Sequence, residues 1–401
     1  MGFKLHLYCF LMLITTSVIS YGQNSVSNNI PSKLQAKIPF ETEHGSIILK
    51  VRLNNNSRIL RLLFDTGADG MAIDQSTADS IGLKISRKQN ATVVGGNTEI
   101  QVSDGNTIHL EDFEIKNQSI AIFKEVHKDV DGIIGNSLTR NYITRVDYDK
   151  KELSLYNFGD YQYEKEGTSL PFTIPAGIFL IPASLSITTE PMHTGDFVFD
   201  TGASYSVICF RPFVKKYKLL VSGFKAEYNG STSGMGMITP TFSGRAAAFS
   251  ISNMPLIKNI PVTLMAGGGQ SESWNPGFDG SIGVRLISRY NFTINMQKKE
   301  IHFSPNKTFS YPYDFTLGGY IFGFDPDGTL VVQDFTTAED PKISLKPGTK
   351  IERINGLSAQ VLLKDSKQLN KLTTLPAGTA CIIESVQNKT TFKDTIINKN
   401  N

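Results

Sequence analysis

Alternating apolar and polar positions are the main structural signal along this chain. Leu49, Val51 and Leu53 alternate with charged residues, a polar turn follows, and the run from Ile59 to Phe64 is mostly apolar. Side chains of a β-strand point alternately to opposite faces, so this pattern is typical of strands with one buried face. The sequence therefore predicts a β-hairpin that ends directly before Asp65.

The second half of the chain shows the same arrangement. Residues 178–187 and 196–199 predict two more strands, which are joined by a loop and followed directly by Asp200. Helical patterns are few and short, which indicates a mainly β fold. Short helices are expected at residues 75–81, 136–142, 284–290 and 365–375.

An internal repeat divides the chain into two related halves. Segments recur in the same order, and the distance between the copies grows from 132 to 148 residues because the second copy has longer loops. The pairs are Ile38–Phe40 with Leu170–Phe172, Phe64–Ala68 with Phe199–Ala203, Ile115–Asn117 with Ile257–Asn259, and Asp131–Gly135 with Asp279–Gly283. Internal similarity of this kind predicts two lobes of similar architecture, here residues 38–158 and 170–308, with a linker at 159–169.

Each half contains an Asp-Thr-Gly-Ala sequence, with Asp65 in the first and Asp200 in the second. A single Asp-Thr-Gly is equally typical of a polar turn, so the functional interpretation depends on its duplication within the longer repeat. Two carboxyl groups held close together share one proton, because they cannot both ionise. The ionised group can then take a proton from water while the protonated group gives one to a peptide carbonyl.

The residues after each Asp have mechanical roles in this interpretation. Gly67 and Gly202 allow the backbone to approach the carboxyl groups closely and to donate N–H bonds to them. The hydroxyl groups of Thr66 and Thr201 can bind the opposite loop. The predicted chemistry needs no covalent intermediate, no metal and no cofactor.

The chain resembles a retropepsin-type aspartyl protease that is duplicated into two lobes, as in pepsins. The resemblance rests on both Asp-Thr-Gly-Ala sequences, on the apolar residues before each Asp and on the two Asp-Gly-x-Ile-Gly segments, and it covers residues 38–305. Pepsins more often have Ser at the positions of Ala68 and Ala203, and Ser281 replaces a residue that is usually hydrophobic. The resemblance implies a bilobal β-barrel fold and an endopeptidase that cuts extended polypeptides with water activated between the two aspartates. Since both aspartates belong to one chain, a monomer is expected to suffice.

The same resemblance implies a hairpin flap over the substrate in each lobe. The candidates are residues 93–102, with Gly95 and Gly96, and residues 228–238, with Gly234 and Gly236. Glycines in a strand context permit hinge motion and close contact with an extended peptide. An ordinary hairpin turn accounts for the same glycines equally well.

Beyond residue 308 the repeat ends and a different pattern begins. Residues 315–390 resemble a PDZ domain, and a tail is expected at 391–401. A glycine-containing loop precedes a strand, a Pro-Gly turn leads into a strand that ends in Ile-Asn-Gly, and an amphipathic helix follows.

The PDZ resemblance implies that this segment binds a C-terminal peptide and that the glycine-containing loop holds the peptide carboxylate. The residues of that loop are Leu317, Gly318, Gly319 and Tyr320. A small α+β domain that only packs on the lobes is the alternative. A second functional hypothesis also stays open, namely a catalytically silent peptide-binding protein that acts through its PDZ-like domain.

The amino-terminal residues predict a secretory signal peptide at residues 1–22. Lys4 precedes an apolar stretch from Leu5 to Ile19, and small residues follow before Gln23. The apolar stretch is short and contains hydroxyl residues, which argues against a membrane anchor. The mature chain is then expected to begin with the segment 23–37, to contain no membrane span, and to be secreted or periplasmic.

Charge and composition exclude several other classes. The formal net charge of the 401-residue chain is +3, so no nucleic-acid partner is expected. Asp69, which directly follows Ala68, is expected to pair with a nearby cation. The six histidines include no His-x-x-x-His pair, and neither a Gly-x-Ser-x-Gly nor a phosphate-loop sequence occurs. Cys209 and Cys381 remain after signal removal, lie in different predicted domains, and are expected to be buried free thiols.

Overall fold

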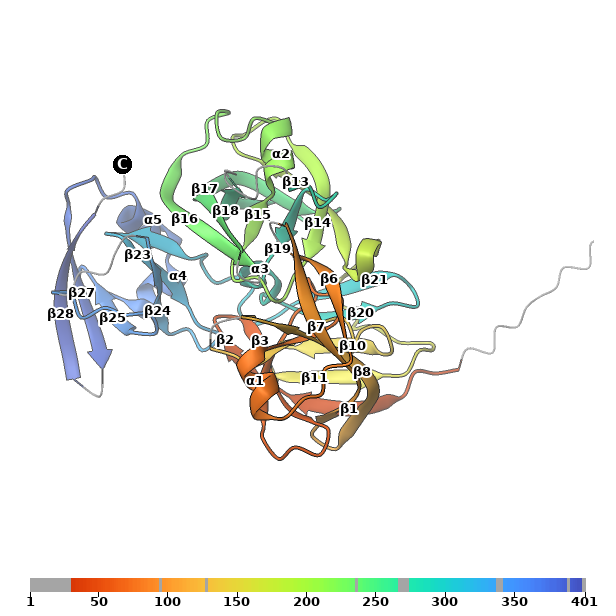
Figure 1. Ribbon diagram of the computed structural model, residues 1–401. Coiled ribbons are helices and arrows are strands. Elements are labelled where there is room, and N and C mark those ends of the chain that lie inside the picture. Colours follow the sequence, from red (N-terminus) through yellow and green to blue (C-terminus); the bar gives the residue numbers. More distant parts are fainter. Residues whose placement is uncertain are drawn as a thin grey trace, which may run out of the picture.

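The computed structural model of the protein describes residues 30–93, 96–126, 129–234, 237–265, 274–336, 342–387 and 390–398. Most of these residues lie in β-strands, which form two lobes and a smaller C-terminal domain (Figure 1). The expected mainly β, two-lobed fold is confirmed. The predicted signal peptide at residues 1–22 lies outside the described residues and stays a prediction.

Lobe 1 is built around a closed β-barrel. Its sheet has the order β2-β3-β4-β9-β5-β8-β7-β6, and an additional pairing between β3 and β7 closes it. The elements are β2 (Glu41–Glu43), β3 (Ser46–Leu53), β4 (Leu60–Phe64), β5 (Met71–Asp74), α1 (Gln75–Ser80), β6 (Arg87–Val93), β7 (Gly96–Leu110), β8 (Phe113–Phe123) and β9 (Gly132–Ile134). In β3 the predicted alternation is present, because Leu49, Val51 and Leu53 are buried and the charged residues between them are exposed.

Lobe 2 repeats this barrel. Its sheet has the order β13-β14-β19-β15-β18-β17-β16, and a pairing between β13 and β17 closes it. The elements are η1 (Pro175–Gly177), β13 (Leu180–Ser186), β14 (His193–Phe199), β15 (Val207–Cys209), α2 (Arg211–Lys216), β16 (Ala226–Gly234), β17 (Met237–Ile251), β18 (Ile257–Met265), β19 (Gly280–Ile282) and α3 (Val284–Ile287). The repeat extends to single backbone angles, since Asn117 in β8 and Asn259 in β18 have positive φ angles of 59° and 53°.

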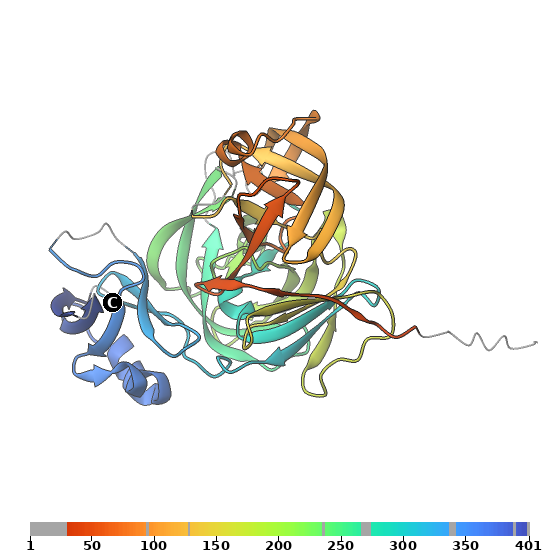
Figure 2. The same cartoon turned by 90° about the horizontal axis from the view of Figure 1, so that it is seen from below.

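A third sheet joins the two lobes. Its order is β1-β11-β10-β20-β21-β12, and β10 of lobe 1 pairs antiparallel with β20 of lobe 2 (Figure 2). The strands are β1 (Leu34–Pro39), β10 (Ile143–Asp147), β11 (Glu152–Tyr156), β12 (Thr168–Pro171), β20 (Tyr290–Asn295) and β21 (Glu300–Pro305). One apolar core runs through this sheet and both barrels, with Phe64, Phe199 and Phe292 among its buried side chains. Packing through this core therefore holds the lobes together.

The C-terminal domain has its own sheet and its own apolar core. Its elements are β22 (Phe315–Leu317), β23 (Tyr320–Phe324), β24 (Leu330–Phe335), β25 (Lys350–Ile354), β26 (Leu357–Ser358), α4 (Ala359–Lys364), α5 (Ser366–Thr373), β27 (Ala380–Gln387) and β28 (Thr390–Ile397). The helix expected at 365–375 is present as α5. The expected tail at 391–401 is wrong at its start, because β28 pairs with β27 over its whole length as far as Ile397.

Two of the short helices predicted in the lobes are present, as α1 and α3, but residues 136–142 form hydrogen-bonded turns instead of a helix. The Asn141 side chain takes the Ser137 carbonyl that a helix would use, whereas the Asn136 carbonyl keeps its helical bond from the Arg140 N–H at 3.1 Å. Thr139 Oγ1 donates to the Asn136 carbonyl at 3.1 Å, and Asn141 Nδ2 donates to the Ser137 carbonyl at 3.1 Å. Such local bonds compete with the helical pattern.

Neither cysteine among the described residues is part of a disulfide. Cys209 and Cys381 are both buried and free, as expected. Among the helices that the structure describes, none combines the length and the apolar character needed to cross a membrane.

Candidate active site

Asp65 and Asp200 stand at the ends of equivalent strands. They directly follow β4 and β14, and the short strand of each Asp-Gly-x-Ile-Gly segment, β9 or β19, runs parallel to that strand. The Asp65 N–H donates to the Ile134 carbonyl and the Asp200 N–H donates to the Ile282 carbonyl, both at 3.0 Å. The repeated segments therefore hold both Asp-Thr-Gly loops in the same way.

Reciprocal hydrogen bonds hold the two loops face to face. The Thr66 N–H donates to Thr201 Oγ1 at 3.0 Å, and the Thr201 N–H donates to Thr66 Oγ1 at 3.1 Å. Each hydroxyl donates in turn to a carbonyl of the opposite lobe, Thr66 Oγ1 to Phe199 at 2.6 Å and Thr201 Oγ1 to Phe64 at 2.7 Å. Both threonines are fully buried, so breaking one bond would leave a buried polar group unpaired.

The two glycines bring each loop against the opposite carboxyl group. The Gly67 N–H donates to Asp65 Oδ1 at 2.9 Å, and the Gly202 N–H donates to Asp200 Oδ1 at 3.0 Å. A Cβ atom at Gly67 would lie 2.6 Å from Asp200 Cγ, and one at Gly202 would lie 2.4 Å from Asp65 Cγ. Neither position has room for a side chain. The structure thus brings the two carboxyl groups together across the lobe boundary, where they share a hydrogen bond.

The surroundings of the two carboxyl groups favour a shared proton. Burial raises the pKa of Asp65, and burial together with the negative charge of Asp65 raises the pKa of Asp200 well above its usual value. The N–H groups of Gly67 and Gly202 act in the opposite direction, because they stabilise the ionised forms. Both aspartates stay partly exposed, so water and a substrate can reach them. Such a pair carries one proton between its two titration steps.

Ser281 contacts Asp200, which the sequence analysis did not predict. The Ser281 hydroxyl donates to Asp200 Oδ2 at 3.3 Å, and Tyr205 is hydrogen-bonded to Ser281. The strand register places Ser281 at the position that Ile133 holds in lobe 1. The signal for this contact in the sequence is a polar residue at an apolar position of the repeat.

Two further interactions hold the Asp65 loop in place. Asn136, which was also missed, is buried, and its Nδ2 donates to the Thr66 carbonyl at 3.1 Å and to the Gly177 carbonyl at 2.9 Å. It therefore connects the Asp65 loop to η1 of lobe 2. Asp69 forms an ion pair with Arg140, so the expected pairing with a nearby cation is present.

The candidate flap glycines lie at the ends of two hairpins. In lobe 1, β6 and β7 pair antiparallel up to Gly96, and in lobe 2, β16 and β17 pair antiparallel up to Gly234. Gly95 and Gly236 lie outside the described residues. A hairpin is thus present at each expected position, while its role as a flap stays a prediction.

The segment Leu317–Tyr320 forms a tight turn, not the open carboxylate-binding loop that the PDZ resemblance implied. Leu317 and Tyr320 are buried and pair with each other as the ends of β22 and β23. Gly318 and Gly319 have φ angles of 61° and 91°, as a two-residue hairpin turn requires. Because β22 and β24 pair with the two edges of β23, the edge that a peptide would join is already occupied next to this turn.

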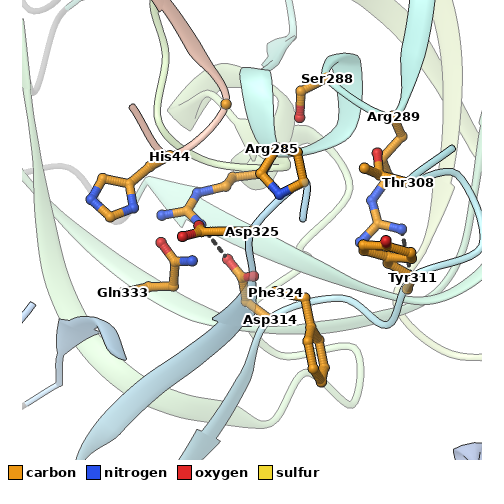
Figure 3. Close-up of a pocket in the computed structure, with 12 residues that line it drawn as sticks. His44, Arg285, Ser288, Arg289, Thr308, Tyr311, Asp314, Phe324, Asp325 and Gln333 are labelled. Carbon is orange, nitrogen blue, oxygen red and sulfur yellow. Dashed lines mark hydrogen bonds and ion pairs between the residues drawn. The ribbon is translucent and has the colours of Figure 1, made fainter. Parts of the chain in front are cut away.

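A separate pocket lies where both lobes and the C-terminal domain meet (Figure 3). His44 lines it from lobe 1, Arg285 from α3 and Asp325 from the C-terminal domain. Arg285 also pairs with Asp314 at 2.9 Å. No lining residue belongs to an Asp-Thr-Gly loop, so this pocket is distinct from the site built on the two aspartates.

Comparisons with known proteins found similarities in sequence and in fold. Residues 49–138 match a family model described as Aspartyl protease. The crystal structure of aspartic proteinase from Irpex lacteus is similar, with a TM-score of 0.45 and 15% sequence identity, and the match covers 68% of this chain and 97% of that chain. No curated protein matches the chain. The family match includes Asp65, so most of lobe 1 has the sequence features of an aspartyl protease.

Proposed function

We propose that this protein is an aspartic endopeptidase that hydrolyses peptide bonds in extended polypeptides. Asp65 and Asp200 hold a water molecule between them. The ionised carboxylate takes a proton from this water while the water oxygen bonds to the peptide carbonyl carbon, and the protonated carboxyl group gives its proton to the carbonyl oxygen. The tetrahedral intermediate then breaks its C–N bond. The nitrogen receives the proton taken from water, and a hydroxyl of the intermediate returns a proton to the other carboxylate.

The observation that carries this proposal is the reciprocal binding of Thr66 and Thr201, which keeps two partly exposed carboxyl groups together. Like charges held close together cost stability, and a scaffold without catalysis needs neither carboxylate. Both loops belong to one chain, so no second subunit is required. The presence of a hairpin in each lobe, β6–β7 and β16–β17, favours an extended substrate that both lobes cover.

Substitution of each aspartate tests the proposal. Asp65→Asn and Asp200→Asn keep the side-chain shape but remove the group that exchanges protons. Hydrolysis of a peptide library by the purified mature chain is expected to fall on the order of 10³-fold or more in both variants, with the fold retained by circular dichroism. Asp112→Asn, a change at an exposed acid in the β7–β8 turn, is the matched control and should leave hydrolysis unchanged. Hydrolysis that survives in either catalytic variant would contradict the proposal.

The alternative function, peptide binding through the C-terminal domain alone, has less support because β22 already pairs with β23 beside the turn at 317–320. A transition-state mimic of the statine type separates the two functions. We expect this mimic to raise the unfolding temperature of the chain, since it replaces the water between the carboxyl groups. Stabilisation by free C-terminal peptides alone would favour the binding function.

A further inference from the structure

We propose that Ser281, supported by Tyr205, is a positioning residue that fixes the orientation of Asp200 and makes the two halves of the dyad unequal. This role rests on the proposed peptidase function, because it acts within the same site. The starting observation is a hydroxyl group at a strand position where lobe 1 has the apolar side chain of Ile133.

Burial gives the Ser281 hydroxyl a defined partner. The residue is 1% exposed, so its hydroxyl must find a partner within the protein. It donates to Asp200 Oδ2 at 3.3 Å, whereas the Gly202 N–H donates to the other oxygen, Oδ1, at 3.0 Å. Both oxygens of Asp200 therefore have a donor, one from the backbone and one from a side chain. Two donors on opposite oxygens resist rotation of the carboxyl group.

Tyr205 is the second polar neighbour of the Ser281 hydroxyl. The two side chains are hydrogen-bonded, and burial raises the pKa of Tyr205 well above its usual value, so its hydroxyl stays protonated. The tyrosine ring packs against the cluster of Ile208, Phe210 and Met265 and is held in place there. Tyr205 therefore helps to hold the Ser281 hydroxyl beside Asp200.

The consequence is a difference between the two carboxyl groups. Asp65 accepts the N–H of Gly67, but Ile133 cannot supply the second donor that Ser281 gives to Asp200. A hydrogen-bond donor favours the ionised form, so Ser281 lowers the cost of placing the negative charge on Asp200. In the part of the chain that the structure describes, Asp65 and Tyr205 are the titratable groups that act on Asp200. Asp65 is retained in both variants tested below, and Tyr205 is retained in Ser281→Ala.

The test compares the pH dependence of kcat/KM in the full mature chain and in Ser281→Ala. Loss of the donor is expected to move the alkaline limb of the profile, where Asp200 gives up the shared proton, to higher pH by about one unit, because ionised Asp200 loses a hydrogen bond. Tyr205→Phe should move the same limb in the same direction by less. Ser154→Ala is the matched control, since Ser154 is also 1% exposed but donates to Glu152 in the interlobe sheet, and its profile should not move.

An alkaline limb that stays in place in both Ser281→Ala and Tyr205→Phe would overturn the proposal, even if kcat or stability falls. If Ser281→Ala does not fold, Tyr205→Phe decides alone. Carbon NMR of chains labelled at the aspartate carboxyl carbon follows the dyad titration without turnover. A wild-type chain that cleaves no peptide would refute the peptidase function, and the NMR titration would still decide whether Ser281 acts on Asp200.

Discussion

The two lobes present identical aspartates on equivalent backbones, yet they surround them with different side chains. Asp65 and Asp200 each accept an N–H bond from the glycine of their own loop, and each loop is bound by the threonine of the opposite lobe. Beside Asp200, however, lies the hydroxyl of Ser281, whereas the matching residue of lobe 1 is Ile133. The shared features fix where the carboxyl groups lie, and the different ones affect how they ionise.

The apolar clusters next to the two loops also contain different kinds of side chain. The lobe 1 cluster is mainly aliphatic and includes Leu63, Ile100 and Ile133. The lobe 2 cluster contains Phe210 and is packed against aromatic residues, among them Trp274. A symmetric homodimer presents the same residues on both sides of its axis, so it cannot produce such a difference. Duplication within one chain therefore allows the two halves of a dyad to become unequal while their positions stay fixed.

Substitution of Gly67 and Gly202 provides the strongest test of the features that the two lobes share. Gly67→Ala and Gly202→Ala would each place a Cβ atom within 2.6 Å of the opposite carboxyl carbon. The displaced carboxyl group is expected to lower kcat/KM by about 10²-fold or more, and equally in both variants. Gly70→Ala is the control, since an added Cβ there meets no atom within 4 Å. A large loss in one lobe only would show that the two loops do not support the dyad equally.

The shared part of the site could be predicted from the sequence because it is carried by short repeated segments. Each Asp-Thr-Gly loop and each Asp-Gly-x-Ile-Gly strand is local in the chain, so the motif and its surroundings are visible together. The unequal part could not be predicted in this way. Ser281 and Asp200 are 81 residues apart, and they meet because β19 runs parallel to β14.

Two local predictions from the sequence are wrong for similar physical reasons. Residues 136–142 are periodic enough to suggest a helix, but Thr139 and Asn141 bind nearby carbonyls with their side chains. In the C-terminal domain, the glycines of the segment 317–320 indicate a turn correctly, yet they do not reveal that β22 pairs with β23 beside it. In both segments the structure depends on which groups bind the backbone N–H and C=O groups, and the composition of the segment does not show this.

The ionisation of the two carboxyl groups makes the stability of the folded chain depend on pH. Burial raises the pKa of both above the usual value, and the charge of Asp65 raises that of Asp200 further. The folded chain then holds a proton that the unfolded chain has lost, so this contribution to stability is complete below about pH 4 and is lost as pH rises through the folded pKa.

Asp200→Asn removes both the titration and the repulsion. We expect this variant to be more stable than the wild type at pH 7, by about 1.4 kcal/mol for each unit by which the pKa was raised, and similar to it at pH 3. Asp65→Asn removes the same repulsion, so we expect it also to be more stable than the wild type at pH 7. Urea unfolding at a series of pH values measures these differences. A variant that is less stable than the wild type at pH 7 would contradict the raised pKa values.

The smallest expected effect concerns the residue directly after each Asp-Thr-Gly-Ala sequence, which is Asp69 in lobe 1 and Ser204 in lobe 2. Asp69→Ser makes the first loop match the second and removes the ion pair with Arg140. The two side chains are 60% and 41% exposed, so solvent screens the pair, and the loss in unfolding free energy should stay within about 1 kcal/mol. Urea unfolding at low and high salt measures this loss, which should shrink at high salt. A larger loss that does not respond to salt would mean that the Asp69–Arg140 pair belongs to the machinery that aligns the lobes, and the difference between the two loops would then reach beyond the ionisation of the dyad.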